Sequence, residues 1–270
     1  MKLEKLGRYE DIVRDVCGNA TQIVQPKIPG SQQNVLMTDG VAGRIVFKFN
    51  NADLVMKNEA VSRLLQAADI PAPHVTAMVR DQYCFEVYPF IPGVTLYERV
   101  GAGMGHDQIS AIFQELLGIQ YRMSQIQAGA VLQMPCGTCA AASRATIVNS
   151  NDVVTAYVIA AMVRIMNLGK WANLGLYHYD LTPKNILISD QNKFAGLLDL
   201  DGVAVCEKHF ALAAMAAKYE QLGGSVSNIC DFYEALSHQS LNRSRIRAQV
   251  NLTNLGKKIM WHLAHKSKAR

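Results

Sequence analysis

The alternation of apolar and polar residues in the first ninety positions predicts a small β-sheet. Predicted strands cover residues 21–28, 33–39, 43–49, 75–81 and 83–90. The turn sequence Pro29-Gly30-Ser31 separates the first two strands and indicates a hairpin. Residues 53–68 break the alternation, because their apolar side chains recur three and four positions apart, and this spacing predicts a helix that ends before Pro71. This part of the chain is expected to be a sheet with one helix.

Helical periodicity dominates the rest of the chain. Residues 109–126 and 153–175 are predicted helices, and so is most of the chain after residue 201. The exceptions are residues 185–189 and 194–200, two short apolar runs on either side of the turn Asp190-Gln191-Asn192, which favour a second hairpin. We therefore predict an α+β protein, with a small antiparallel-sheet lobe over residues 1–91 and a larger, mainly helical lobe over residues 92–270.

Composition narrows the functional classes only a little. The 270 residues carry a formal net charge of +5, which suits an anionic ligand. The sequence lacks a basic stripe interleaved with aromatic residues, so the charge does not indicate nucleic-acid binding. The amino-terminal residues lack the apolar core of a signal peptide, and no apolar run reaches the length of a membrane span, so we expect a cytoplasmic protein. Cysteines stand at positions 17, 84, 136, 139, 206 and 230. Their apolar surroundings predict reduced thiols, and the Cys136/Cys139 pair lacks the further ligands that a zinc site needs.

The segment YHYDLTPKNILIS, residues 177–189, carries the first candidate chemistry. Phosphoryl transfer requires a carboxylate that orients the attacking hydroxyl, oxygen ligands for magnesium and a cation for the phosphates. Asp180 precedes the first strand of the second predicted hairpin, Asn185 lies where that strand begins, and Asp199 lies at the end of the next strand. If the two strands pair, Asn185 and Asp199 fall at the same end of the hairpin, where two hard oxygen ligands could bind Mg²⁺.

The segment HYDLTPKNILI, followed by LLDLD, resembles the signature of aminoglycoside phosphotransferases and choline kinases, the small-molecule branch of the protein-kinase-like fold. The resemblance implies that Asp180 is the catalytic base or hydroxyl-orienting residue. It also implies that Asn185 and Asp199 hold magnesium and that the phosphoryl donor is ATP, although the sequence does not decide between ATP and GTP. Asp201 is given a supporting role, and His178 is expected to brace the catalytic loop.

This fold also requires a strand lysine for the α- and β-phosphates and a helical glutamate that holds the lysine. Lys48 lies among apolar residues in IVFKF, and a buried lysine needs a partner. Glu59 follows on the predicted helix and is the expected partner. Lys57 is a competing lysine, but its helical setting suggests that it faces solvent.

Two further segments are expected to contact the nucleotide. Gly30 and Ser31 lie in the turn that should cover the phosphates, although the turn lacks the G-x-G-x-x-G pattern of protein kinases. The segment EVYPFIPG, residues 86–93, resembles the linker that hydrogen-bonds adenine. Because Pro89 has no N–H group, Phe90 and Ile91 are the candidate donors.

The acceptor is the part of the function that the sequence leaves most open. A small-molecule hydroxyl, of a sugar, amino alcohol or aminoglycoside, is expected. The few carboxylates of the carboxyl-terminal part argue against an aminoglycoside. Its short length and basic final helix resemble those of kinases for lipopolysaccharide-core or other envelope sugars, which are the alternative. The basic residues of the last helix could contact an anionic membrane or glycolipid: Lys257, Lys258, Trp261, His262, His265, Lys266, Lys268 and Arg270. A solvated helix end is the simpler interpretation. An atypical protein kinase and a non-catalytic nucleotide-binding regulator remain alternatives.

Overall fold

A computed structural model of the chain describes residues 2–17, 22–25, 34–40, 43–127 and 174–266. Internal contacts separate the chain into two compact units. The first comprises residues 1–94, 187–190 and 195–201, and the second comprises residues 95–186, 191–194 and 202–270. Residues from the second predicted hairpin therefore belong to the same unit as the amino-terminal sheet.

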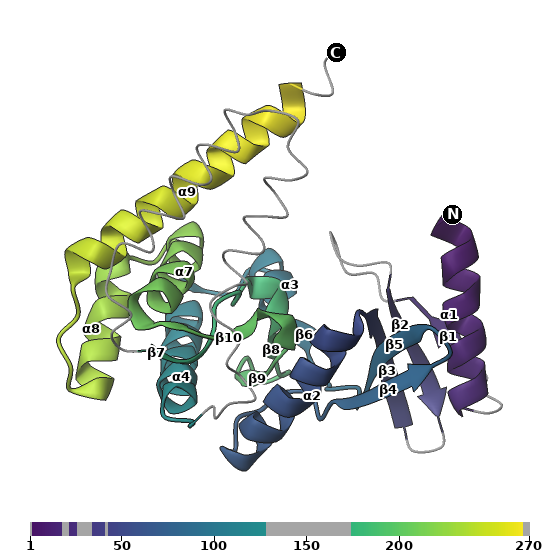
Figure 1. Cartoon of the computed structure of the whole chain (residues 1–270). Helices are drawn as coiled ribbons and strands as arrows, with labels where there is room; N and C mark the ends of the chain where they lie inside the picture. Colours follow the sequence, from purple (N-terminus) through teal and green to yellow (C-terminus); the bar gives the residue numbers. More distant parts are fainter. Residues whose placement is uncertain (1, 18–21, 26–33, 41–42, 128–173, 267–270) are drawn as a thin grey trace. The chain divides into compact units, whose positions relative to one another are not determined.

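The first unit contains a five-stranded antiparallel sheet with the strand order β1-β2-β3-β5-β4 (Figure 1). Its strands are β1 (Ile23–Val24), β2 (Val35–Gly40), β3 (Gly43–Asn50), β4 (Thr76–Arg80) and β5 (Tyr83–Pro89). All five lie within or beside the stretches in which alternation predicted strands. Strand β3 is the central strand of the sheet and pairs with β5, and Lys48 of β3 lies opposite Glu86 of β5.

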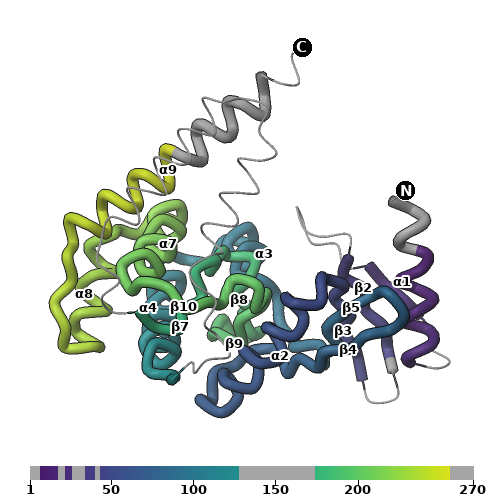
Figure 2. The backbone as a smooth tube through the Cα atoms, in the orientation of Figure 1, coloured from purple at the N-terminus to yellow at the C-terminus, as the bar shows by residue number. Residues whose placement is uncertain are grey.

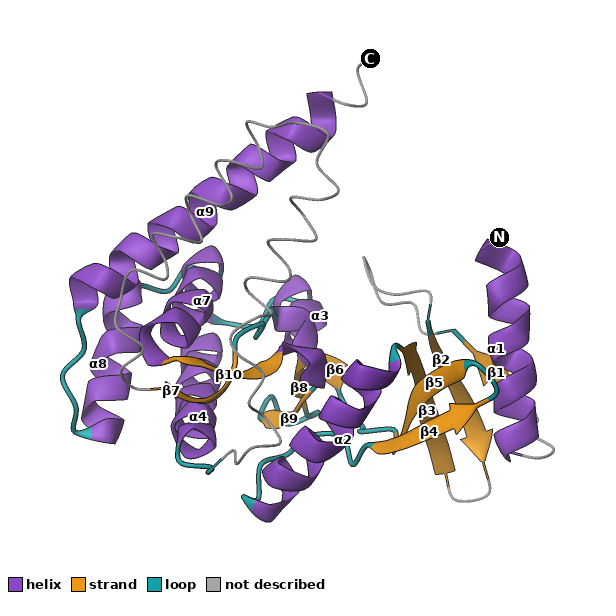
Figure 3. Ribbon diagram, in the orientation of Figure 1, coloured by secondary structure: helices purple, strands orange, loops and turns teal. Residues whose placement is uncertain are grey.

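Helices cover both faces of this sheet (Figures 1 and 3). Because successive side chains of a strand point to opposite faces, Phe47 and Phe49 point away from Lys48. They join the buried core beneath helix α1 (Lys2–Cys17), where the ring of Tyr9 stacks on that of Phe49 with 3.9 Å between ring centroids. The opposite face, which carries Lys48, is therefore the face turned towards helix α2.

Helix α2 (Ala52–Ala67) confirms the helical periodicity of its sequence. The side chain of Asn51 accepts a hydrogen bond from the amide of Leu54, which caps the first turn of the helix. After the helix, Asp69 adopts a left-handed backbone conformation with φ of 50°, and Pro71 follows two positions later. The helix packs on β4 and β5, so its side chains reach the sheet face that carries Lys48.

Strands β8 (Ile186–Ile188) and β9 (Phe194–Leu197) form the second predicted hairpin. Asn192 turns the chain between them with a φ of 58°. Strand β6 (Val94–Thr95) adds to β8 on its other side. Gly93, directly before β6, has a φ of 143°, and a Cβ atom there would lie 2.8 Å from the carbonyl oxygen of Ile188. Glycine is therefore required at this point of the 91–93 connection.

The second unit is mainly helical (Figure 2). Its helices are α3 (Leu96–Gly101), α4 (His106–Ser124), α7 (Lys208–Gln221), α8 (Val226–Ser237) and α9 (Arg243–Lys266), with a short 3₁₀ turn, η2 (Pro183–Asn185). A second such turn, η3 (Leu200–Gly202), begins in the first unit and ends in the second. Helix α7 packs against α8 and α9, and α4 packs against α8. A two-stranded antiparallel sheet pairs β7 (Leu174–His178) with β10 (Val203–Glu207). Sequence periodicity missed both strands, since it extended the 153–175 helix into β7 and predicted helix throughout β10.

In the part of the chain that the structure describes, no helix is both long enough and apolar enough to cross a membrane. Most of the predicted helix over residues 153–175 lies outside the described residues.

Candidate active site

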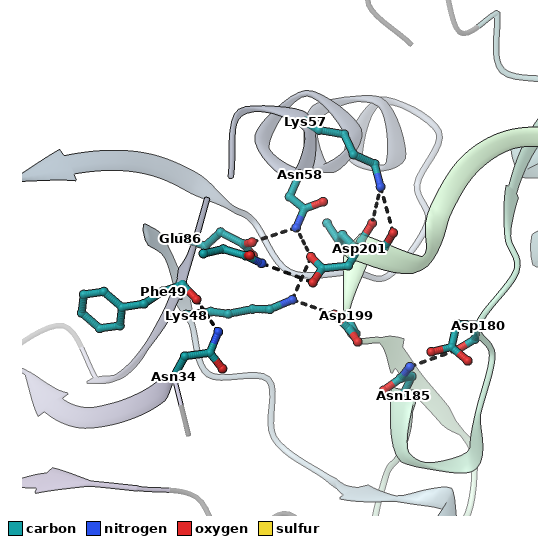
Figure 4. A network of polar contacts seen from close by, with 12 residues as sticks. Asn34, Lys48, Phe49, Lys57, Asn58, Glu86, Asp180, Asn185, Asp199 and Asp201 are labelled. Atoms are coloured by element: carbon teal, nitrogen blue, oxygen red, sulfur yellow. Dashed lines mark hydrogen bonds and ion pairs between the residues drawn. The ribbon is translucent and has the colours of Figure 1, made fainter. Parts of the chain in front are cut away.

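The side chain of Lys48 lies in a cluster of carboxylates within the first unit (Figure 4). Only 6% of its side chain is exposed, and its ammonium nitrogen lies 2.6 Å from Oδ1 of Asp199 and 2.9 Å from Oδ1 of Asp201. Lys48 therefore has a partner, as its burial requires, and the two partners are the acidic residues that follow β9.

Two residues that were not predicted complete this cluster. The side-chain amide of Asn58, on α2, donates hydrogen bonds to Oε1 of Glu86 at 2.7 Å and to Oδ1 of Asp201 at 2.5 Å. Asn58 is fully buried and Glu86 is 2% exposed. Glu86 is a single acidic residue between apolar neighbours in the strand YCFEVYP. The same kind of pattern identified Lys48, so it could have indicated a buried, paired side chain at position 86 as well.

The charges of the cluster shift the pKa values of its members. Burial alone would lower the pKa of Lys48, but the negative charges of Glu86, Asp199 and Asp201 outweigh it and raise the pKa. Burial raises the pKa of Glu86 to about 7, against the opposing effects of Lys48 and of the hydrogen bond from Asn58. For Asp201, burial is outweighed by the charge and hydrogen bond of Lys48, and its pKa is lowered. Lys48 thus stays charged at every physiological pH.

Lys57 corrects one prediction, because its side chain is buried and does not face solvent. Its exposure is 7%, and its ammonium donates to the backbone carbonyls of Leu200 at 3.3 Å and Asp201 at 2.9 Å. Burial lowers its pKa to about 8, although the charge of Asp201 opposes the shift. The prediction failed because position 57 lies on the same buried face of α2 as Asn58 and Val61.

The predicted ion pair between Lys48 and Glu59 is not the one that the structure shows. Glu59 lies 3.1 Å from the guanidinium of Arg63, one helical turn along α2, and accepts a hydrogen bond from the amide of Ala77 on β4. Successive residues of a helix point about 100° apart. The side chain that points from α2 into the cluster is therefore that of Asn58.

Asp199 has an unusual backbone conformation. Its φ of 59° lies in the left-handed region, which residues other than glycine adopt at a cost of about 1 kcal/mol or more. Strain of this kind persists where surrounding contacts fix the backbone, and it concentrates at functional sites. The contacts of Lys48 and Lys57 with residues 199–201 supply such fixing.

The donor set around Asp199 suits magnesium bound together with a nucleotide. Lys48 bonds Oδ1 of Asp199, and the side chain keeps 30% exposure, so the carboxylate can be reached by an ion. Among the described residues, no group of three or more His, Cys, Asp or Glu side chains could hold a metal ion. Mg²⁺ commonly takes only one or two carboxylates from the protein and the remaining oxygens from phosphates and water. Asp199 fits that type of site.

The predicted catalytic loop, from Asp180 to Asn185, belongs to the second unit. Two hydrogen bonds to the carbonyl of Asp180 hold its conformation. The carbonyl oxygen of Asp180 accepts from the amide of Thr182 at 2.7 Å and from Nδ2 of Asn185 at 2.9 Å. The side-chain nitrogen of Asn185 thus fixes the loop, and its Oδ1 is the atom suited to a metal. Asp180 and Asn185, joined by a dashed line in Figure 4, come from one turn of chain at η2.

His178 is held on both sides, directly before this loop. The side-chain amide of Gln120, on α4, donates to the carbonyl of His178 at 2.7 Å and accepts from its amide at 3.0 Å. The imidazole packs against Gly202, where a Cβ atom would lie 2.6 Å from Cε1 of His178. The amide of Tyr179 also donates to the carbonyl of Gly202. Packing and backbone bonds therefore position His178, whose bracing of the loop stays a prediction.

The two candidate donors of the linker differ in their hydrogen bonding. The amide of Phe90 donates to the carbonyl of Arg44 at 2.9 Å, and the Phe90 ring lies 5.3 Å from the guanidinium carbon of the same residue. That amide is already engaged in extending the β3–β5 pairing. Ile91 is therefore the better candidate for an adenine contact. Gly30 and Ser31, like Cys136 and Cys139, lie outside the described residues.

The chain belongs to the phosphotransferase enzyme family (APH), whose model matches residues 26–216. The resemblance and the phosphotransferase class that the sequence predicted are thereby confirmed. No curated protein matches the chain in sequence.

Solved structures confirm the protein-kinase-like α+β fold. An aminoglycoside-3′-phosphotransferase of type VIII aligns with a TM-score of 0.64 at 18% identity, over 91% of this chain and 98% of that one. The GDP and kanamycin complex of APH(2″)-IIia aligns with a TM-score of 0.69 at 11% identity, over 97% and 93%. Choline kinase LicA from Streptococcus pneumoniae aligns with a TM-score of 0.60 at 13% identity, over 94% and 92%.

Proposed function

We propose that this protein transfers the γ-phosphate of ATP or GTP, in the presence of Mg²⁺, to a hydroxyl group of a small molecule. The observation that carries the proposal is the contact of the buried Lys48 with Asp199 and Asp201, 2.6 and 2.9 Å away. The phosphotransferase family to which the chain belongs supports the reaction class. A nucleotide is supported by the GDP that the APH(2″)-IIia structure contains.

In this proposal Lys48 binds the nucleotide phosphates. Its raised pKa keeps the ammonium charged, so it can meet the phosphate oxygens when a nucleotide displaces its present carboxylate contacts. The negative charges of Glu86 and Asp201 are proposed to keep the ammonium protonated in that state. Ile91 is proposed to hydrogen-bond the base, with Phe90 shaping the linker, and Gly30 and Ser31 are proposed to cover the phosphates.

Asp180 is proposed as the residue that orients the acceptor. Its carboxylate accepts the hydroxyl proton while the acceptor oxygen bonds to the γ-phosphorus and the bond from that phosphorus to the β,γ-bridging oxygen breaks. The products are a phosphate monoester, a nucleoside diphosphate and one proton. Asn185 and Asp199 are the proposed magnesium ligands, and magnesium would neutralise charge on the phosphates.

The acceptor is proposed to be a sugar, an amino alcohol or an aminoglycoside. Proteins of this fold that act on such molecules include the aminoglycoside phosphotransferases and the choline kinase described above. A kinase for an envelope sugar would make use of the basic residues at positions 257–270, next to an anionic glycolipid. We expect the reaction to occur in the cytoplasm, where nucleotide and magnesium are supplied.

Thermal denaturation with ATP, GTP and ADP, each with and without Mg²⁺, tests the nucleotide site. A ligand that binds only the folded protein raises its melting temperature in proportion to RT ln(1 + [L]/Kd). We expect a magnesium-dependent rise for ATP or GTP, which Asp199→Asn abolishes and the exposed control Asp190→Asn retains. No rise with any nucleotide would overturn the proposal.

The acceptor is then identified by transfer of radiolabelled γ-phosphate to panels of sugars, amino alcohols and aminoglycosides. Nucleotide binding with no transfer to any acceptor and no slow transfer to water would favour a nucleotide-binding regulator. Transfer to a protein and to none of these small molecules would favour the atypical protein kinase.

A further inference from the structure

Two adjacent residues of α2 hold residue 201 at two different points. Lys57 donates to the carbonyl oxygens of Leu200 and Asp201, while Asn58 donates to the side chain of Asp201. These contacts fix both the backbone and the carboxylate of the residues that follow Asp199. All of these residues belong to the first unit.

Burying an ammonium group costs free energy. At position 57, packing into an apolar core does not explain why the side chain is a lysine. The side chain is 7% exposed, and Val55 and Val61 are buried on the same helix. An apolar residue would avoid the cost of taking a charge out of water. Lys57 instead places N–H donors against the carbonyls of two successive residues, directly after the strained Asp199.

The carbonyls bonded by Lys57 belong to the residues whose backbone turns away from Asp199 into η3. Hydrogen bonds to these carbonyls limit the rotation of the peptide units that follow Asp199. Such restraint by the surrounding structure is what keeps a residue in the left-handed conformation. Lys48 meanwhile fixes Oδ1 of the Asp199 carboxylate. Backbone and side chain are thus held separately, by Lys57 from the helix and by Lys48 from the sheet.

We propose that Lys57 is a positioning residue for phosphotransfer, which holds the backbone of residues 199–201 so that the Asp199 carboxylate is correctly oriented for magnesium. The proposal rests on the proposed function for its consequence in catalysis. The effect on the backbone itself is independent of that function and can be measured without nucleotide or metal.

The test compares Lys57→Met, which keeps the length of the side chain but removes its donors, with Lys218→Met on α7 as the matched control. In the metal-free protein, hydrogen exchange of the amides at 200–203 should become at least tenfold faster in Lys57→Met and unchanged in the control. The Mg²⁺ concentration that gives half of the ATP-dependent or GTP-dependent thermal shift should rise at least tenfold. The fitted nucleotide affinity at saturating Mg²⁺ should stay within about twofold.

A merely structural role predicts another pattern, in which Lys57→Met lowers the melting temperature but leaves both local exchange at 200–203 and the magnesium requirement as in the wild type. That result would overturn the proposal. If Lys57→Met does not fold, Lys57→Leu, a smaller residue that also lacks donors, is measured in the same way, and wild-type values in it would again overturn the proposal. If the wild type itself shows no magnesium-dependent shift, the proposed function fails, whereas the exchange at 200–203 still decides whether Lys57 positions the backbone.

Discussion

Lys48 and Glu86 lie directly opposite each other on neighbouring antiparallel strands, on one face of the sheet. Facing pairs of opposite charge stabilise a sheet modestly at a surface. Here both side chains are buried, so each makes the other's charge tolerable, and Asn58 links Glu86 to Asp201. The cluster around Lys48 therefore behaves as one electrostatic unit, and removing any one charge should affect the rest.

Removing the cation should destabilise the protein strongly. Lys48→Met leaves Glu86, Asp199 and Asp201 close together without their central positive charge. Breaking a buried ion pair from one side costs roughly 3 to 5 kcal/mol, and we expect a loss of that size in the free energy of unfolding at pH 7, measured with urea. Lys193→Met, at an exposed position, should change it by less than about 0.5 kcal/mol. Equal stabilities of the two variants would show that the cluster contributes nothing.

The raised pKa of Glu86 predicts a specific pH dependence. A carboxyl group with a pKa of about 7 in the folded protein, above its ordinary value, holds a proton near pH 6 that the unfolded chain has released. The contribution of Glu86 to stability is therefore greatest below about pH 4.5 and declines as the pH rises towards 7 and slightly beyond, by roughly 3 kcal/mol in all. Glu86→Gln, which can still accept the Asn58 hydrogen bond, should lack this decline.

The measurement is urea unfolding of the metal-free wild type and Glu86→Gln between pH 5 and 8. The difference between their free energies of unfolding should change in favour of the variant as the pH rises. Lys57, whose lowered pKa of about 8 affects stability mainly above this range, remains in both proteins and largely cancels. A difference independent of pH would mean that Glu86 titrates normally.

Asp180 should be needed for turnover and not for nucleotide binding. Asp180→Asn keeps the shape of the side chain but cannot accept the acceptor's proton, so transfer should fall by about 10²- to 10⁴-fold, measured with the acceptor found in the screen. The magnesium-dependent thermal shift with nucleotide should be retained. The same loss of nucleotide binding as in Asp199→Asn would contradict the separate roles proposed for the two carboxylates.

Gly202 should tolerate no side chain. Gly202→Ala places a methyl group 2.6 Å from the buried imidazole of His178, and the resulting repacking should cost about 1 to 3 kcal/mol of stability. Gly118→Ala on α4 is the matched control. Its new methyl group meets nothing within 4 Å, and alanine is favoured over glycine in a helix, so stability should rise by roughly 0.5 to 1 kcal/mol. Similar stabilities for the two variants would argue against the tight packing of His178.

Local patterns predicted the sheet of the first unit, helix α2 and the β8–β9 hairpin, because each is formed by neighbouring segments with clear periodicity. Strands β7 and β10 were missed because they pair residues 174–178 with 203–207, at a separation that alternation cannot detect. Helix α1 was missed because its charged residues obscured the apolar face that packs on Phe49.

In the candidate site, too, the sequence predicted local features and missed those that depend on distant contacts. Lys48 was recognised from its apolar surroundings, but its partners were not, since they depend on strand register and on which way α2 is rotated. A rotation by one residue decides whether Asn58 or Glu59 reaches Glu86 and Asp201, and whether Lys57 is buried. Sequence spacing gave the helix but not that rotation. The roles of Asp180, Asn185 and Asp199 stay predictions, and the variants Asp180→Asn and Asp199→Asn test those of the two carboxylates.

The bond pattern between Gln120 and His178 has a consequence for mechanical coupling in the second unit. The glutamine amide donates one hydrogen bond to His178 and accepts one from it, so it imitates the backbone of a third strand beside β7. At His178, the hydrogen-bonding groups on the outer edge of β7 are therefore satisfied by a side chain from α4. Any displacement of α4 along its axis would pull on the strand end two residues before Asp180. Gln120→Met, which loses both the donor and the acceptor, would uncouple the helix from the loop while leaving the strand itself in place.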